Sequence, residues 1–191
     1  MNFNTYCINL KARHKKWVAV QIEAEKLNLN PQRFGGILKT DGHMGCMMSH
    51  ISLLKQIKES MFLVIEDDIE VLGTLEDMNK AIEQLPKDWD LLYLGAQLEQ
   101  PLERYSDNLF ILKQAKCNHA ILYNNQNGVV DYIIKRHRYI IDVFYSEEVQ
   151  EKFNCFITYP MICTQVCGYS DTVHWWKDYD HISAKYKQYT T

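Results

Sequence analysis

The chain has 191 residues, of which 47% are hydrophobic and 24% are charged, and its formal net charge is −3. This composition predicts a globular protein with a single domain over residues 1–191. The charge balance argues against nucleic acid as a partner, because nucleic-acid-binding proteins carry a basic excess. No apolar run approaches membrane-spanning length and the start is too polar for a signal peptide, so we expect no membrane span and a cytoplasmic location.

Six cysteines are spread along the chain, several of them in apolar contexts that are typical of buried free thiols. No paired CxxC set accompanies them, which argues against a zinc site. Without a secretory signal, we predict that all six are reduced. They are Cys7, Cys46, Cys117, Cys155, Cys163 and Cys167.

The first part of the chain predicts a strand, a helix, a loop and a second helix. The strand is expected at residues 6–10 and the helix at 11–29, where apolar residues recur with helical spacing. Basic residues at the start of this helix oppose its dipole, which a nearby phosphate would offset; a solvated basic face is the simpler reading. Residues 33–37 are expected to lead into a loop, and a helix with a methionine-rich apolar stripe follows from Met44.

The most informative stretch of the chain runs from Met61 to Glu70. Its five apolar residues read as a buried strand, and Glu66, Asp67 and Asp68 follow directly. Ligands bind at the carboxyl ends of strands in open α/β sheets, and a divalent cation would relieve the repulsion between these carboxylates. A solvated acidic turn is the alternative. If the strand continues, alternation puts Glu66 and Asp68 on one face and Asp67 on the other.

Further elements complete an α/β pattern. A helix is predicted over residues 75–85, opened by a capping box of Thr74 and Asp77, and a strand over 88–95. The order of elements predicts a mixed, mostly parallel sheet flanked by helices. Residues 96–116 are expected to form a mobile surface loop of the kind that acts as a lid, with a short strand near residue 111.

The last part of the chain contains one carboxylate inside an apolar run. Residues 119–123 predict a strand and 129–137 a helix, and two more strands are expected within 155–166. Asp142 lies between them in the run YIIDVF; a buried aspartate is costly unless it is paired or bound to metal, and capping of a short helix is the alternative. The tail, 171–191, either folds over the site or ends without order; its Trp175–Trp176 pair is expected to pack on the chain itself.

Several motifs together resemble glycosyltransferase family 25, which is named for lipooligosaccharide-building enzymes. The most specific are the GCxxSH block that opens the second helix and the acidic block after the buried strand. The resemblance covers about residues 6–170. The full ordered set is Ile8-Asn9-Leu10 with Arg13, Arg33-Phe34, Gly45-Cys46 with Ser49-His50 and Leu54-Lys55, Ile65-Glu66-Asp67-Asp68-Ile69, Trp89-Asp90 to Leu94-Gly95, Ile141-Asp142, Pro160 to Gln165, and Ser170.

The resemblance implies a GT-A fold, which is a Rossmann-like domain that binds a nucleotide sugar. It implies inverting transfer from the donor, taken here as a UDP-sugar, to a saccharide or glycoconjugate acceptor, as in lipopolysaccharide biosynthesis. Mn²⁺ or Mg²⁺ is the expected cofactor, with Asp68, Glu66 and His119 as candidate ligands. Asp142 is the candidate catalytic base or a further metal ligand, and His119 is a second candidate for the base. The residues assigned to the donor are Asn9, Leu10, Arg13, Ser49, His50, Glu66, Asp67, Gln165 and Ser170.

Two alternatives remain open at this point. One is a catalytically degenerate protein that binds a nucleotide sugar without transferring it. The other is a metal-dependent phosphatase or nuclease that uses the same acids, for which the near-neutral charge gives no support.

Overall fold

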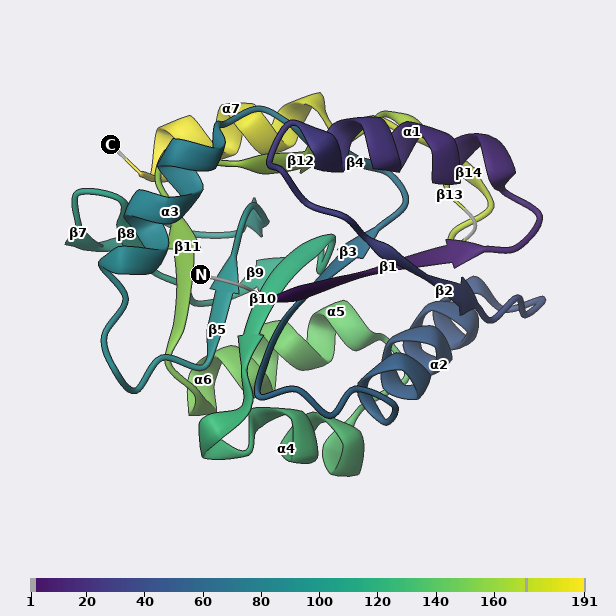
Figure 1. Ribbon diagram of the computed structural model, residues 1–191, viewed down its shortest axis with the longest axis horizontal. Coiled ribbons are helices and arrows are strands. Elements are labelled where there is room, and N and C mark those ends of the chain that lie inside the picture. Colours follow the sequence, from purple (N-terminus) through teal and green to yellow (C-terminus); the bar gives the residue numbers. More distant parts are fainter. Residues whose placement is uncertain (1–2, 171, 191) are drawn as a thin grey trace.

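The computed structural model describes residues 3–170 and 172–190 (Figure 1). Eight strands form its central sheet, and in chain order they are β1 (Asn4–Leu10), β2 (Gln32–Gly36), β3 (Met61–Glu66), β5 (Leu91–Tyr93), β7 (Glu103–Ser106), β8 (Leu109–Ile111), β10 (Ala120–Asn124) and β11 (Cys155–Thr158). Across the sheet the order is β2-β1-β3-β10-β5-β11-β8-β7. β1 is parallel to both β2 and β3, and β5 is parallel to β11, whereas β10 runs antiparallel between β3 and β5. The predicted mixed α/β sheet is therefore confirmed.

Helices cover both faces of this sheet. They are α1 (His14–Glu25), α2 (Gly42–Leu54), α3 (Leu75–Glu83), α4 (Val129–Arg136), α5 (Ile141–Phe144), α6 (Gln150–Lys152) and α7 (Asp180–Tyr189), with the 3-10 turn Asn125–Asn127 before α4 and a π-helical turn, Tyr145–Val149, between α5 and α6. In Figure 1, α1, α3 and α7 lie above the sheet, and α2, α4, α5 and α6 lie below it. Among the described residues, no helix combines the length and the apolar composition that crossing a bilayer requires.

β3 lies at the centre because its side chains are apolar on both faces. Phe62 and Val64 pack into the core on the α2 and α4 side, while Leu63 and Ile65 pack into the core on the α1 and α3 side. All four are at most 1% exposed. Burying such side chains stabilises the fold by about 1.5–3 kcal/mol each, so the strand that carries the acidic residues at its end is rigidly placed.

Three short antiparallel pairs supplement the sheet: β4 (Ile69–Val71) with β12 (Cys163–Gln165), β6 (Gln97–Leu98) with β9 (Ala115–Lys116), and β13 (Gly168–Ser170) with β14 (Trp175–Lys177). The first pair matters for the site. It sets Gln165 opposite Ile69, and the Val166 amide donates to the Asp68 carbonyl oxygen at 2.8 Å.

Three expectations from the sequence were wrong. Residues 33–37 are largely strand β2, and residues 96–116 are not a mobile loop but carry β6 to β9, with Leu98 and Leu112 fully buried. Trp175 and Trp176 are 59% and 69% exposed rather than packed on the chain. β2 and β6 to β9 are short or lie at the edge of a sheet. They form because a partner strand supplies hydrogen bonds, and the spacing of apolar residues does not reveal that partner.

The tail is ordered over its described residues, 172–190; Asp171 and Thr191 lie outside them. α7 buries Ile182 and Tyr186 and packs against β6. Of the tail, Thr172 lines the first of the two pockets at the site, next to Ser170.

Gly95 follows β5 at a close approach between two backbone segments. A Cβ at this position would lie 1.7 Å from the Cys163 carbonyl oxygen, whereas a Cβ at Gly35 in β2 would meet no atom within 4 Å. We expect Gly95→Ala to reduce the free energy of unfolding by about 3 kcal/mol and Gly35→Ala to change it by at most about 0.5 kcal/mol. Urea unfolding of both variants measures this, and equal stabilities would contradict the predicted approach.

Candidate functional site

The acidic residues form a turn between β3 and β4. Glu66 is the last residue of β3, and Asp67 and Asp68 follow it at the sheet edge where β1 also ends. This is the edge at which ligands bind in open α/β folds. Two pockets meet here, and both are lined by Glu66 and Asp68, together with Cys46, Ser170 and Thr172.

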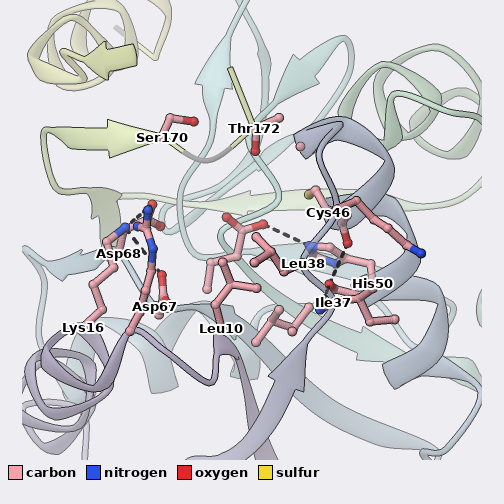
Figure 2. Close-up of a pocket in the computed structure, with 18 of the residues that line it drawn as sticks. Leu10, Lys16, Ile37, Leu38, Cys46, His50, Asp67, Asp68, Ser170 and Thr172 are labelled. Atoms are coloured by element: carbon pink, nitrogen blue, oxygen red, sulfur yellow. Dashed lines mark hydrogen bonds and ion pairs between the residues drawn. The ribbon is translucent and has the colours of Figure 1, made fainter. Parts of the chain in front are cut away.

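The first pocket lies between the ends of β1 and β2 and the first turns of α2 (Figure 2). Figure 2 shows Lys16, Asp67 and Asp68 at one side of it and Cys46 and His50 at the other. Of the residues predicted to bind a donor, seven line this pocket: Leu10, Arg13, Ser49, His50, Glu66, Asp67 and Ser170. The lining combines three basic residues, Arg13, Lys16 and Lys39, with the three acids, and such basic side chains suit phosphate oxygens.

The second pocket lies on the other side of Glu66 and Asp68 and is lined by Asp142, Asn118 and Gln165. Two lysines, Lys116 and Lys177, stand in its wall. Asp67 lines the first pocket only. The strand ends at Glu66, so the condition for the predicted alternation of the three acids is not met: all three line the first pocket, and only Glu66 and Asp68 also line the second.

Asn9 is buried beneath the first pocket and holds Asp67. Its Nδ2 donates to Asp67 Oδ2 at 2.5 Å, and its Oδ1 accepts from Arg33 Nε at 2.8 Å. The Arg33 guanidinium in turn lies 5.5 Å from the Trp17 ring centroid. Asn9 is 1% exposed and lines neither pocket, so its effect on the site is to position the Asp67 carboxylate.

Lys16 supplies a cation between two of the acids. Its Nζ lies 3.6 Å from Asp67 Oδ1 and 3.5 Å from Asp68 Oδ2 (Figure 2). From the other side, Gln165 Nε2 donates to Asp68 Oδ1 at 3.3 Å. Sequence reasoning did not assign Lys16 to the site, because basic residues at a helix start usually form a solvated face. Its place directly after a strand that ends at the same sheet edge was the available signal.

Ser49 and His50 have different roles on α2. The Ser49 hydroxyl donates to the Gly45 carbonyl oxygen at 2.7 Å and accepts from the Ile37 amide at 2.8 Å, so it fastens the pocket loop to the helix. His50 Nε2 lies 3.0 Å from Glu66 Oε1, while its buried Nδ1 has no hydrogen-bond partner among the described residues. His50 therefore orients the Glu66 carboxylate at the junction of the two pockets.

His119, a predicted metal ligand, is fully buried and lines neither pocket. Its Nε2 lies 3.3 Å from the Cys163 carbonyl oxygen. Burial lowers the pKa of its ring below the usual value, despite the nearby charges of Glu66 and Asp68. The structure brings the ligand atoms of Cys46, His50 and Glu66 within 4.8 Å of one another, and His119 is not part of this group.

Asp142 stands in the first turn of α5, inside the second pocket. Burial and the charge of Glu66 raise the pKa of its carboxyl to about 6, against hydrogen bonding from the Asn118 backbone. The helix is capped at Ile140 rather than by Asp142, so the capping alternative is wrong. An aspartate with this pKa is ionised at neutral pH and still able to accept a proton, which suits a general base.

The three acids of the turn are held in different electrostatic states. Burial raises the pKa of Asp67 to about 6 and, with Glu66, also raises that of Asp68, while Lys16 opposes both shifts. For Glu66, burial acts in the same direction, but the hydrogen bond and charge of His50 outweigh it and the net pKa is lowered. Crowded anions of this kind lose stability at neutral pH unless a cation joins them.

Asp67 makes stability fall as pH rises through acidic values. In the folded protein the pKa of Asp67 is about 6, above the usual 3.8, so the folded state binds more protons than the unfolded state between these pH values. The resulting stabilisation is fully present below pH 3.8 and is lost as the pH rises through 6. Asp67→Asn lacks this loss. Between pH 4 and pH 7, the free energy of unfolding of the variant should therefore rise by about 2 kcal/mol relative to that of wild type. Urea unfolding at both pH values tests this. The control is Asp107→Asn, whose side chain is 99% exposed; an equal change in both variants would contradict the prediction.

Comparisons with known proteins agree with this geometry. Two solved structures share the fold: a glycosyltransferase involved in the glycosylation of the major capsid of PBCV-1 (TM-score 0.52, 10% identity, 82% of this chain and 81% of that one) and A197 from STIV (TM-score 0.55, 8% identity, 94% and 96%). At such identities the likeness concerns the fold alone, and it confirms a GT-A-like architecture.

Sequence relatives fall into one family. Procollagen galactosyltransferase 1 of Danio rerio is 32% identical over 96 residues, and the probable inactive glycosyltransferase 25 family member 3 of Bos taurus is 31% identical over 77 residues. These matches cover 44% and 37% of this chain but only 16% and 13% of the relatives, so the chain spans a small part of their length. The family model described as glycosyltransferase family 25 (LPS biosynthesis protein) matches residues 38–146, which include α2, the acidic turn and Asp142, and the chain belongs to this family.

Proposed function

We propose that this chain transfers a sugar from a nucleotide sugar, a UDP-sugar, to a hydroxyl group of a saccharide or glycoconjugate, with inversion and with Mn²⁺ or Mg²⁺. The observation that carries the proposal is the meeting of two pockets at Glu66 and Asp68. One pocket would hold the donor and the other the acceptor. Because the pockets join at two carboxylates, the two substrates of a group-transfer reaction would lie on opposite sides of the reacting bond.

The residues at the junction fit a divalent cation. Glu66 and Asp68 present oxygen ligands to both pockets, and Lys16 already lies within 3.6 Å of Asp67 and Asp68, where it stands in for a cation. Gln165 adds a buried amide oxygen that has no hydrogen-bond partner among the described residues. When bound there, Mn²⁺ or Mg²⁺ would neutralise the diphosphate on which charge develops.

Side chains of the protein itself would bind the donor and activate the acceptor. Arg13 and Lys16 line the donor pocket and suit phosphate oxygens, and Asp67 faces the same pocket, where it suits donor hydroxyls. Asp142 faces the other pocket and takes the proton of the attacking hydroxyl. Attack from the side opposite the leaving diphosphate gives inversion.

Thermal unfolding with a panel of nucleotides and nucleotide sugars, each with Mn²⁺ and with chelator, tests the proposal. A ligand that binds the native state alone raises the midpoint by mass action. We expect a UDP-sugar to raise it with Mn²⁺ and not with chelator, and UDP-galactose is the first choice because relatives are named galactosyltransferases. No shift with any donor would overturn the proposal.

A second candidate is donor binding without transfer. Relatives from Bos taurus and Homo sapiens are named inactive family members, and they match this chain about as well as the galactosyltransferases do. Incubation of the purified protein with the donor distinguishes the two. Slow release of free sugar supports transfer activity, because working transferases leak to water, whereas binding with no release favours the second candidate.

A further inference from the structure

Cys46, His50 and Glu66 form a second group of potential metal ligands at the junction of the pockets. Each offers one ligand atom, and these atoms all lie within 4.8 Å of one another. The residues come from two rigid elements, since Cys46 and His50 are one helical turn apart on α2 and Glu66 ends β3. Residues four apart lie on the same helix face, so α2 presents a thiol and an imidazole together to the carboxylate.

The chemistry of this trio differs from that of the acidic turn. Sulfur, imidazole nitrogen and a single carboxylate are the donor set of zinc and similar transition metals, whereas Mg²⁺ prefers oxygen alone. Tetrahedral zinc with bonds of about 2.0–2.3 Å sets its ligand atoms about 3.3–3.8 Å apart. His50 Nε2 and Glu66 Oε1 lie 3.0 Å apart and all three ligand atoms lie within 4.8 Å of one another, so small side-chain rotations would bring the trio to that geometry.

We propose that Cys46, His50 and Glu66 form a three-ligand site for Zn²⁺ or a similar soft dication, with the fourth position open to the donor pocket. The sequence argued against zinc because it lacks a CxxC set, but these ligands come from a helix and a strand that are distant in sequence. On binding, Cys46 gives its thiol proton to solvent, and the thiolate and the carboxylate together balance the charge of the ion. Figure 2 shows Cys46 and His50 side by side at the pocket wall, which leaves the fourth position accessible.

The surroundings favour a dication over an empty trio. Glu66, Asp68 and Asp142 line the second pocket together with Cys46, so three carboxylates repel one another around the trio. A dication at the trio reverses this repulsion. His50 Nε2 already lies 3.0 Å from Glu66 Oε1, so two of the three ligand atoms face each other, and a dication would take the place of the proton between them.

Co²⁺ added to chelator-treated protein tests the site, because a cobalt–thiolate bond gives a charge-transfer absorption band that oxygen ligands do not give. We expect the band to saturate at one Co²⁺ per chain, to disappear on addition of Zn²⁺, which binds N and S ligands more tightly, and to resist Mg²⁺. Cys46→Ser should abolish it, and His50→Gln should weaken Co²⁺ binding at least about tenfold.

Cys167→Ser is the matched control, because Cys167 with Asp178 and Asp180 is the other described trio of potential ligands, on an exposed surface. It should leave the band unchanged. Loss of the band in Cys167→Ser, its persistence in Cys46→Ser, or its absence from wild type would each overturn the proposal. Circular dichroism and the unfolding midpoint of each variant show that a lost band is not lost folding.

Glu66 belongs both to this trio and to the cation site of the proposed function. Where that function holds, Zn²⁺ should inhibit sugar release and Cys46→Ser should lessen the inhibition. This consequence rests on the proposed function, whereas the cobalt band is read without donor or acceptor. If the cobalt band forms but Zn²⁺ does not inhibit sugar release, the result contradicts the use of Glu66 in transfer. The metal site at Cys46, His50 and Glu66 would not be affected by that result.

Discussion

Asp68→Asn is expected to abolish metal-dependent donor binding while it stabilises the ligand-free protein. The substitution keeps the size of the side chain and the oxygen that accepts from Gln165, but it removes a charge that two pockets share. Burial and Glu66 raise the pKa of Asp68, so its ionised form costs stability at neutral pH when no ion is bound. The loss of one charged oxygen ligand should weaken Mn²⁺-dependent affinity for the donor at least about 100-fold.

Isothermal titration with the donor, with and without Mn²⁺, measures the affinity, and thermal unfolding measures the stability. Asp107→Asn removes the same charge from an exposed loop and should change neither quantity. If Asp68→Asn retained full metal-dependent affinity, Asp68 would not be a ligand. If it lost both affinity and stability, a structural role through Gln165 and Lys16 would explain the result instead.

The sequence predicted the parts of the site that chain-local patterns encode. An apolar run followed by three carboxylates identified β3 and the acidic turn, because a strand buried on both faces needs continuous apolar residues. The capping box of Thr74 and Asp77 at the start of α3 is also confirmed. In these cases the residues that form the feature are neighbours in the chain.

Features that depend on distant partners were missed. β2 forms because its backbone pairs with β1, although Arg33, Gly35 and Gly36 show no strand periodicity. Lys16 joins the site because α1 starts at the sheet edge where Asp68 ends its turn, and Cys46 joins it because α2 faces β3. Such meetings follow from topology, and single-sequence patterns of charge or apolar spacing do not specify them.

Asp142→Asn is expected to lower turnover by about 10²- to 10⁴-fold and to change donor affinity less than about twofold. Asp142 lines the second pocket and not the first, where we propose that the donor binds, so removing its charge should leave the phosphate contacts intact. Asparagine has nearly the same shape but accepts no proton at neutral pH. Release of sugar to water measures turnover, because a base that activates the acceptor hydroxyl also activates a water molecule in its place.

The pH profile separates a base from a merely structural residue. The carboxyl of Asp142 has a pKa of about 6 and acts when ionised, so wild-type kcat/KM should rise as pH increases through about 6, and this limb should vanish in Asp142→Asn. Asp131→Asn, on the exposed first turn of α4, should keep the wild-type profile. A loss that appears mainly as weaker donor or metal affinity would instead make Asp142 a ligand, since Asp142 and Glu66 line the same pocket.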